Sequence, residues 1–152
     1  MNHDACIEAL NDLIKINNDR IEGYKKAIDE LQDDEHFDLK TVFSSMVTES
    51  QEYKNALQQK VHEYGGSTEE GTTTAGKIYR VWMDVRSALT VNDRASVLSN
   101  CEAGEDAAQK AYKTAIEDED VMEETKVLLR GQKQGLKTSH DKIKALRDKA
   151  KA

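Results

Sequence analysis

Proline is absent from this 152-residue chain, and glycine (8 residues) and aromatic residues (5%) are few. Because proline is the strongest helix breaker, its absence favours an all-helical protein. No stretch approaches the roughly 18 consecutive apolar residues that a transmembrane helix needs. The first residues also lack the basic start and apolar run of a signal peptide. We therefore expect no membrane partner.

Cysteine is scarce, and acidic residues outnumber basic ones. Cys6 and Cys101 lie near opposite ends of the sequence and match no Cys-x-x-Cys spacing, so we expect reduced thiols in a cytoplasmic protein. The 22 lysines and arginines against 29 aspartates and glutamates give a net charge of −7. Since a nucleic-acid-binding protein needs a dominant basic face, we expect no nucleic-acid partner. The length suits a single domain over residues 1–152.

Apolar residues recur in steps of three, four and seven along four long segments, which predicts four amphipathic helices. Asp38 is the expected N-cap of the second helix, and Gly65 and Gly66 end that helix. Thr90 and Asp93 form a candidate capping box for the third helix. The expected helices span residues 4–31, residues 39–64, a segment from this capping box to Ile116, and a segment from Asp120 to about Lys149.

The connections between these helices predict how the helices are arranged. The first and third connections are short, which makes the helices that they join antiparallel neighbours. The middle connection contains a loop at residues 65–77 and a short amphipathic helix at residues 78–89, and it can run the length of a bundle. The sequence therefore predicts an all-α, ferritin-like up-down-down-up four-helix bundle with a short extra helix in the long crossover.

Each apolar face is interrupted by a polar residue near the middle of its helix. Counting from the turns places these positions in one layer of the bundle. Because an unpaired buried carboxylate costs several kcal/mol, such a layer needs a cation, a hydrogen-bond network or water. If Glu105 pairs with Gln132 or Asn17, Glu105→Leu should cost little stability. The interrupting residues are Asn17, Glu49 or Ser50, Glu105 and Gln132.

One interpretation of this layer is a metal centre. Di-iron carboxylate bundles use a Glu from each of two helices and Glu-x-x-His from each of the other two. This sequence contains no Glu-x-x-His; it offers the pairs Glu49-x-x-Glu52 and Glu102-x-x-Glu105, with His140 as a nitrogen ligand. The other interpretation, which the missing histidines favour, is a hydrogen-bonded layer that sets the register of the helices.

Several short motifs follow one another along the chain: Leu10–Ile14, Asp19 with Glu22–Tyr24, Trp82–Asp84, Gly104–Ala107 with Tyr112, and His140–Ile143. Together they resemble the motifs of an uncharacterised bacterial family of ferritin-like four-helix-bundle proteins, classed as a domain of unknown function. The resemblance implies a ferritin-like bundle without an established activity. Related stress-induced bundles hold a dinuclear metal, so the resemblance also implies iron or manganese as a candidate cofactor.

The candidate metal ligands that follow from this relationship are Glu22, Glu49, Glu52, Glu102, Glu105 and His140. Glu22, Glu105 and His140 lie inside the matched motifs. The other three rest on their positions on the predicted helices.

Other patterns have a structural explanation. Gly71–Lys77 is similar to a phosphate-binding loop, but it lacks the final Ser or Thr and the preceding strand, so we expect a flexible crossover loop. The acidic run at residues 117–124 suits a helix N-terminus, where the dipole favours carboxylates. We expect Trp82 to pack on the bundle and anchor the short helix, in preference to forming a docking patch. Gly23 would permit the close approach of two helices.

Two classes of function follow from these observations. No Ser-His-Asp or Cys-His set occurs at an interpretable spacing, so we expect no catalytic residues. The favoured function is that of a non-enzymatic structural or stress-associated interaction protein, which binds either copies of itself or another protein. The alternative is a dinuclear metal store or a metal-dependent oxidoreductase.

Overall fold

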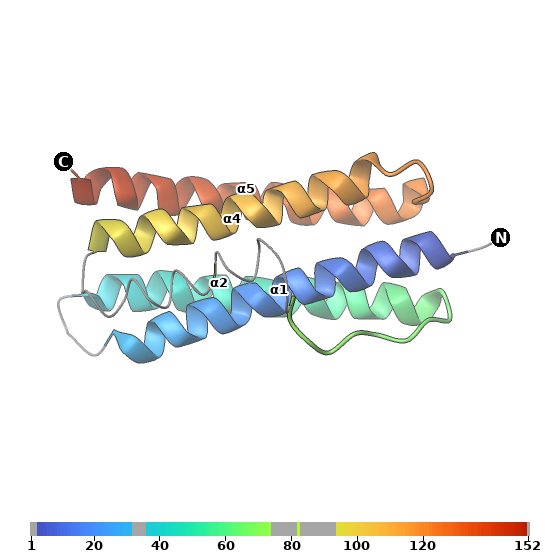
Figure 1. Cartoon of the computed structure of the whole chain (residues 1–152), viewed down its shortest axis with the longest axis horizontal. Coiled ribbons are helices and arrows are strands. Elements are labelled where there is room, and N and C mark those ends of the chain that lie inside the picture. The colour runs from blue at the N-terminus through green and yellow to red at the C-terminus, as the bar shows by residue number, and fades with distance from the viewer. Residues whose placement is uncertain (1–2, 32–35, 74–81, 83–93, 152) are drawn as a thin grey trace.

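Four long helices make up most of the described fold. The computed structural model describes residues 3–31, 36–73, 82 and 94–151. Within these residues it contains α1 (Asp4–Glu30), α2 (Phe37–Glu63), α4 (Arg94–Glu117) and α5 (Glu123–Lys151), and no strand. α1 and α5 run in one direction, and α2 and α4 run in the other (Figure 1). The prediction of an all-α protein built on four long helices is confirmed.

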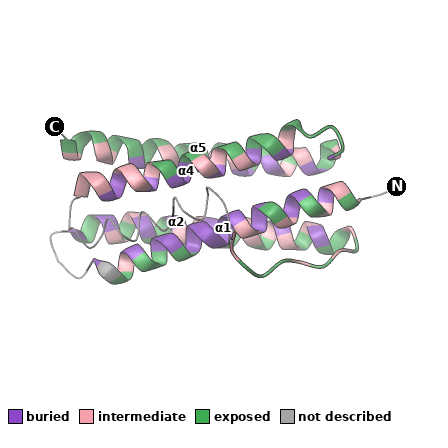
Figure 2. Cartoon of the chain, in the orientation of Figure 1, coloured by how far each residue is buried: buried purple, intermediate pink, exposed green. Residues whose placement is uncertain are grey.

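The helices pack as two antiparallel hairpins. α1 packs chiefly against α2, and α4 against α5, and the hairpins meet along α1–α4 and α2–α5. Each helix carries a buried stripe and an exposed one (Figure 2), as the apolar spacing predicts. One apolar cluster surrounds Leu10, Leu57 and Leu129, and a second surrounds Tyr24 and Phe43. Polar residues of α1 are buried between the two clusters.

The helix ends differ from the predicted ones by a few residues. α2 begins at Phe37, with Asp38 in its first turn. Asp38 is therefore not the N-cap, and its carboxylate pairs with Arg94 at the start of α4. α2 ends before Gly65, whose φ of 79° is the left-handed conformation that glycine adopts readily. The predicted short helix and the predicted capping box fall on residues 78–93, which lie outside the described residues apart from Trp82.

The last helix also begins later than predicted. α5 starts at Glu123, three residues after Asp120. The Asp120 N–H donates to the Asp118 carboxylate at 2.9 Å, so this segment forms a turn before the helix. The Glu123 and Glu124 carboxylates occupy the first turn of α5, where the helix dipole favours negative charge.

The segment after α2 is held against α1 by polar side chains. Asn18 donates to the Gly71 carbonyl at 2.8 Å. The Asp19 carboxylate accepts hydrogen bonds from both the N–H and the hydroxyl of Thr73. These bonds satisfy the polar groups of Asn18 and Asp19, two buried side chains of α1. The described part of the expected flexible loop is thus fixed to α1, and residues 74–77 of the loop motif lie outside the described residues.

Trp82 packs between the two hairpins. Its side chain is 4% exposed, and its ring meets the Tyr24 ring edge-on at a centroid distance of 5.1 Å. A Cβ atom at Gly104 of α4 would lie 2.7 Å from the indole, and one at Gly23 of α1 would also overlap it. The prediction that Trp82 packs on the bundle is confirmed. The explanation offered for Gly23 is wrong, because this glycine makes room for an indole ring.

Two predictions about cysteine and membranes can be compared with the structure. Cys6 and Cys101 are free and buried, as expected for reduced thiols. Among the described helices, none combines the length and the apolarity that a membrane span requires.

Candidate functional site

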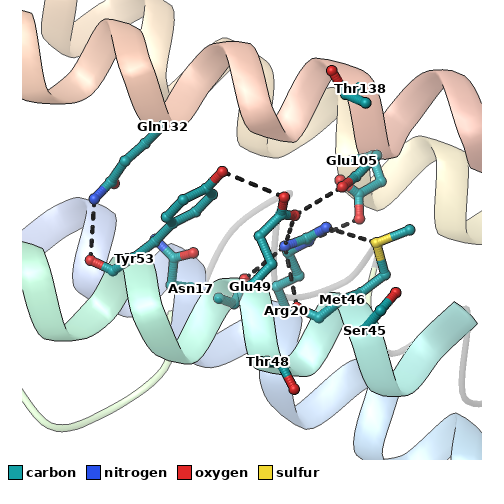
Figure 3. A network of polar contacts seen from close by, with 12 residues as sticks. Asn17, Arg20, Ser45, Met46, Thr48, Glu49, Tyr53, Glu105, Gln132 and Thr138 are labelled. Carbon is teal, nitrogen blue, oxygen red and sulfur yellow. Dashed lines mark hydrogen bonds and ion pairs between the residues drawn. The ribbon is translucent and has the colours of Figure 1, made fainter.

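A buried arginine lies at the centre of the bundle. Arg20 follows Asn17 by three residues and precedes Tyr24 by four, a spacing that places all three on the buried face of α1. The Arg20 Nε donates to Glu105 Oε1 at 2.8 Å. One terminal nitrogen donates to the Ser50 hydroxyl at 2.8 Å and lies 2.9 Å from Glu49 Oε1 (Figure 3). The guanidinium group thus joins α1, α2 and α4.

The rest of the guanidinium group is also in contact with protein atoms. The terminal nitrogen that contacts Ser50 and Glu49 also donates to the Met46 carbonyl at 3.3 Å, and the other terminal nitrogen lies 3.2 Å from the Met46 sulfur. Burial lowers the pKa of Arg20, but the Glu105 carboxylate, Tyr24 and Glu49 outweigh that effect and raise the pKa above its usual value. Arg20 therefore stays charged, and it supplies the cation that buried carboxylates require.

Glu105 is the most deeply buried carboxylate of this network. Its side chain is fully buried, and Oε1 accepts hydrogen bonds from Arg20 and, at 2.6 Å, from the Tyr24 hydroxyl. Burial and the Glu105 charge raise the pKa of Tyr24 well above its usual value, so the hydroxyl remains a donor. The same two causes raise the pKa of the Cys101 thiol, which keeps that thiol protonated and unreactive. Glu105 Oε2 has no hydrogen-bond partner among the described residues.

Glu49 extends the network to the fourth helix. Its Oε1 accepts a hydrogen bond from the Ser139 hydroxyl of α5 at 2.8 Å, and Oε2 accepts one from the Tyr53 hydroxyl at 3.3 Å. Gly135 makes room for this tyrosine, because a Cβ atom at Gly135 would overlap the hydroxyl. Burial and the nearby Glu49 charge raise the pKa of Tyr53 to about 12. We call Arg20, Glu49, Ser50 and Glu105 the arginine network.

A second polar chain crosses the bundle beside the arginine network. The Asn17 amide donates to the Tyr112 hydroxyl at 2.9 Å, and this hydroxyl donates to Gln132 Oε1 at 2.6 Å. The Gln132 amide in turn donates to the Tyr53 carbonyl at 3.2 Å (Figure 3). These contacts connect α1, α4, α5 and α2 in that order. We call Asn17, Tyr112 and Gln132 the amide chain.

The sequence prediction of inward-facing polar positions is confirmed. Asn17, Ser50, Glu105 and Gln132 are all buried. The suggested pairing of Glu105 with Gln132 or Asn17 is wrong, because Glu105 bonds to Arg20 and Tyr24 instead. The arginine side chain is longer than an amide side chain, so Arg20, one turn away from Asn17, forms the hydrogen bond to the Glu105 carboxylate.

The structure does not bring the six candidate metal ligands together. Glu49 and Glu105 converge, but they converge on the Arg20 guanidinium group. Glu22 and Glu52 are exposed and lie outside the arginine network. Glu102 and His140 meet at the surface between α4 and α5. The candidates thus divide among the core, the solvent-exposed surface and one hairpin.

Sequence reasoning missed two residues of these groups. Arg20 was overlooked because arginine is almost never fully buried unless it is paired. Its spacing from Asn17 and Tyr24, both on the predicted inner face, was the available signal. Asp106 was also missed, although it follows Glu102 by four residues and therefore shares its side of α4.

Glu102, Asp106 and His140 form what we call the hairpin cluster. The His140 Nε2 lies 2.8 Å from Asp106 Oδ1 and 3.6 Å from Glu102 Oε1. The other ring nitrogen, Nδ1, lies 3.0 Å from Asp141 Oδ1. Arg147 pairs with the second oxygen of Glu102. Side chains of α4 and α5 therefore meet here as well as in the core.

A groove of about 470 Å³ lies between the N-terminal half of α1 and the C-terminal end of α4. Its apolar lining includes Ala9, Leu13, Ile16, Ala111 and Ala115, and its acidic lining includes Glu8, Asp12, Asp118 and Asp120. Burial, followed by the nearby Glu8 charge, raises the pKa of Asp12. Lys15 also lines the groove, so four carboxylates and one ammonium group leave it with an apolar surface and a net negative charge.

Four long helices around a buried polar core define this chain as an all-α, four-helix protein. Residues 5–118 match the family described as "Domain of unknown function (DUF2383)", and the chain belongs to this family. The match includes Arg20, Glu49 and Glu105, whereas α5 lies beyond it. No curated protein matches the chain.

Proposed function

We propose that this protein is a ferritin-like bundle with a non-enzymatic, structural role, and that it acts by associating with a second copy of itself. The opposite directions of the hairpin helices and the long connection between the parallel helices α2 and α4 support the ferritin-like assignment. A stress-associated role in bacteria rests on the motif resemblance. The free, buried thiols support a cytoplasmic location.

The arginine network is the observation that carries the non-enzymatic role. A dinuclear centre needs carboxylates with open positions for metal ions. Here Glu49 and Glu105 are bridged by Arg20, whose guanidinium group occupies the space between them. The raised pKa values of Tyr24 and Cys101 keep both groups protonated, so neither supplies a nucleophile. This core stabilises the packing of the helices without offering a reactive group.

The groove between α1 and α4 is the surface that we assign to self-association. Its acidic lining lies at the end of the bundle that holds the start of α1 and the end of α4. The opposite end of the bundle carries exposed lysines in the last turns of α5, including Lys144, Lys149 and Lys151. Two copies that lie side by side in antiparallel orientation would bring these opposite charges to the same end, and a two-fold axis repeats that contact at the other end.

Phe37 supplies the apolar group for this contact. It lies at the start of α2, at the lysine-bearing end, and is 66% exposed. In an antiparallel pair it lies at the same end as the groove of the second copy, and we infer that its ring docks there and is removed from water. Burial of one phenylalanine contributes about 1.5–3 kcal/mol, and the symmetric pair has two such contacts.

Sedimentation equilibrium over a dilution series tests this proposal. Wild-type protein should form dimers that dissociate on dilution and at high salt. Phe37→Ser should abolish the dimer, whereas Val127→Ser should retain it, because Val127 is apolar and 63% exposed but lies near the start of α5, where it lines a different groove against α2. A wild-type protein that is monomeric at every concentration would refute the proposal. So would equal dimerisation of the two variants.

A further inference from the structure

The hairpin cluster brings together one imidazole and two carboxylates from two helices. Glu102 and Asp106 lie four residues apart on α4, and His140 projects from α5. One donor atom from each of the three residues lies within 4.8 Å of the other two. This set combines a nitrogen with oxygen donors, which suits a divalent transition-metal ion such as Zn²⁺.

The distances in the cluster are close to those of a coordination shell. Zn²⁺ binds nitrogen and oxygen ligands at about 2.1 Å, so two donors of a tetrahedral site lie about 3.4 Å apart. The Nε2 atom of His140 lies 3.6 Å from Glu102 Oε1 and 2.8 Å from Asp106 Oδ1. Small rotations of the side chains therefore suffice to accommodate an ion.

The orientation of the His140 ring is compatible with a metal ligand. Both ring nitrogens face carboxylate oxygens, since Nδ1 lies 3.0 Å from Asp141 Oδ1 and Nε2 lies 2.8 Å from Asp106 Oδ1. A protonated imidazole can donate from both nitrogens, and a bound metal ion takes the place of the Nε2 proton while the Nδ1 proton remains on the side of Asp141. Donation of the Nδ1 proton to a carboxylate is the usual support of a metal-binding histidine.

The surroundings of the cluster also favour an ion at this position. The Glu102 and His140 side chains are only 13% and 17% exposed, which reduces the screening of their interaction with a cation. Arg147 pairs with Glu102 Oε2 and leaves Oε1 directed toward His140. The Asp106 side chain is 54% exposed, so the remaining coordination position is open to water.

We propose that Glu102, Asp106 and His140 bind one divalent transition-metal ion, for which Zn²⁺ is the fitting probe. The ion links α4 to α5 at the surface of the hairpin. This site is separate from the arginine network, and it contains a single ion in place of the dinuclear centre considered from the sequence. It does not depend on the self-association groove, which lies between α1 and α4.

Calorimetric titration of untagged, metal-free protein with zinc chloride tests the site. Wild-type protein should bind one Zn²⁺ per chain, and its melting temperature should rise with the zinc concentration. Asp106→Asn keeps the size of an exposed side chain and removes a charged ligand, so it should weaken zinc binding at least about tenfold. His140→Gln should do the same. Circular dichroism of each variant without zinc checks that the helices are retained.

His62→Ala is the matched control, because His62 is an exposed histidine on α2, away from the cluster. It should bind zinc as tightly as the wild type. The proposal is overturned if wild-type protein takes up no zinc, or if folded Asp106→Asn and His140→Gln bind zinc with wild-type affinity. It is also overturned if His62→Ala weakens binding as much as these variants do.

Discussion

Replacing Arg20 by methionine removes the cation that Glu49 and Glu105 share. The Glu105 carboxylate would remain fully buried, with the Tyr24 hydroxyl as its donor. Removing one partner of a buried ion pair costs about 3–5 kcal/mol, because the other charge is left without compensation. Total stability of a domain is about 5–15 kcal/mol, so Arg20→Met should remove a large fraction of it.

A double-mutant cycle combines Arg20→Met with a second substitution, Glu105→Leu. This change should cost less than Arg20→Met, because Glu49 and Ser50 still accept from the guanidinium group. Combining the two substitutions removes both buried charges, so the double variant should be no less stable than Arg20→Met alone. The coupling energy between the positions should be about 2–3 kcal/mol.

Urea unfolding followed by circular dichroism gives the free energy of each variant. The exposed pair Arg130 and Glu123, replaced in the same way, serves as the control and should show little coupling. The reasoning is refuted if the losses from Arg20→Met and Glu105→Leu simply add. A loss of less than about 1 kcal/mol for Arg20→Met would refute it as well.

Three further predictions concern packing, pH and hydrogen bonding. Gly104→Ala should destabilise the protein by about 1–3 kcal/mol, because the added Cβ overlaps the Trp82 ring. Gly131→Ala should stabilise the protein by up to about 1 kcal/mol, because the added Cβ has no neighbour within 4 Å. Urea unfolding of both variants checks this contrast. Burial raises the pKa of Asp19 from 3.8 to about 6, so protonation favours the folded state and the free energy of unfolding should fall as pH rises through this interval. Asp19→Asn should flatten that part of the pH profile, and an unchanged profile would contradict the assignment. Tyr112→Phe removes the hydroxyl that joins two buried amides and should cost about 1–3 kcal/mol in urea unfolding; a loss within experimental error would mean that the amide chain contributes little.

The helices were predictable because their apolar residues repeat with the period of an α-helix. The period also assigns faces, which is why Asn17, Ser50, Glu105 and Gln132 were correctly predicted to point inward. The end of α2 at Gly65 followed from the conformation that glycine permits. These properties depend on neighbours within a few turns of one chain, and such neighbours are set by sequence spacing.

The partners of the inward-facing side chains were decided by the tertiary structure. Spacing along α1 does not state whether Glu105 of α4 meets an amide or a guanidinium group, because that depends on how the helices are rotated and shifted against each other. The rotation and shift of the helices also bring His140 to Asp106 at the surface of the hairpin, while Glu105 faces the core. The sequence by itself determined four amphipathic helices with polar residues at their centres. Only the packing of the helices made Arg20 the cation of the core, because a long arginine side chain pairs with whichever carboxylate the neighbouring helix places within its reach.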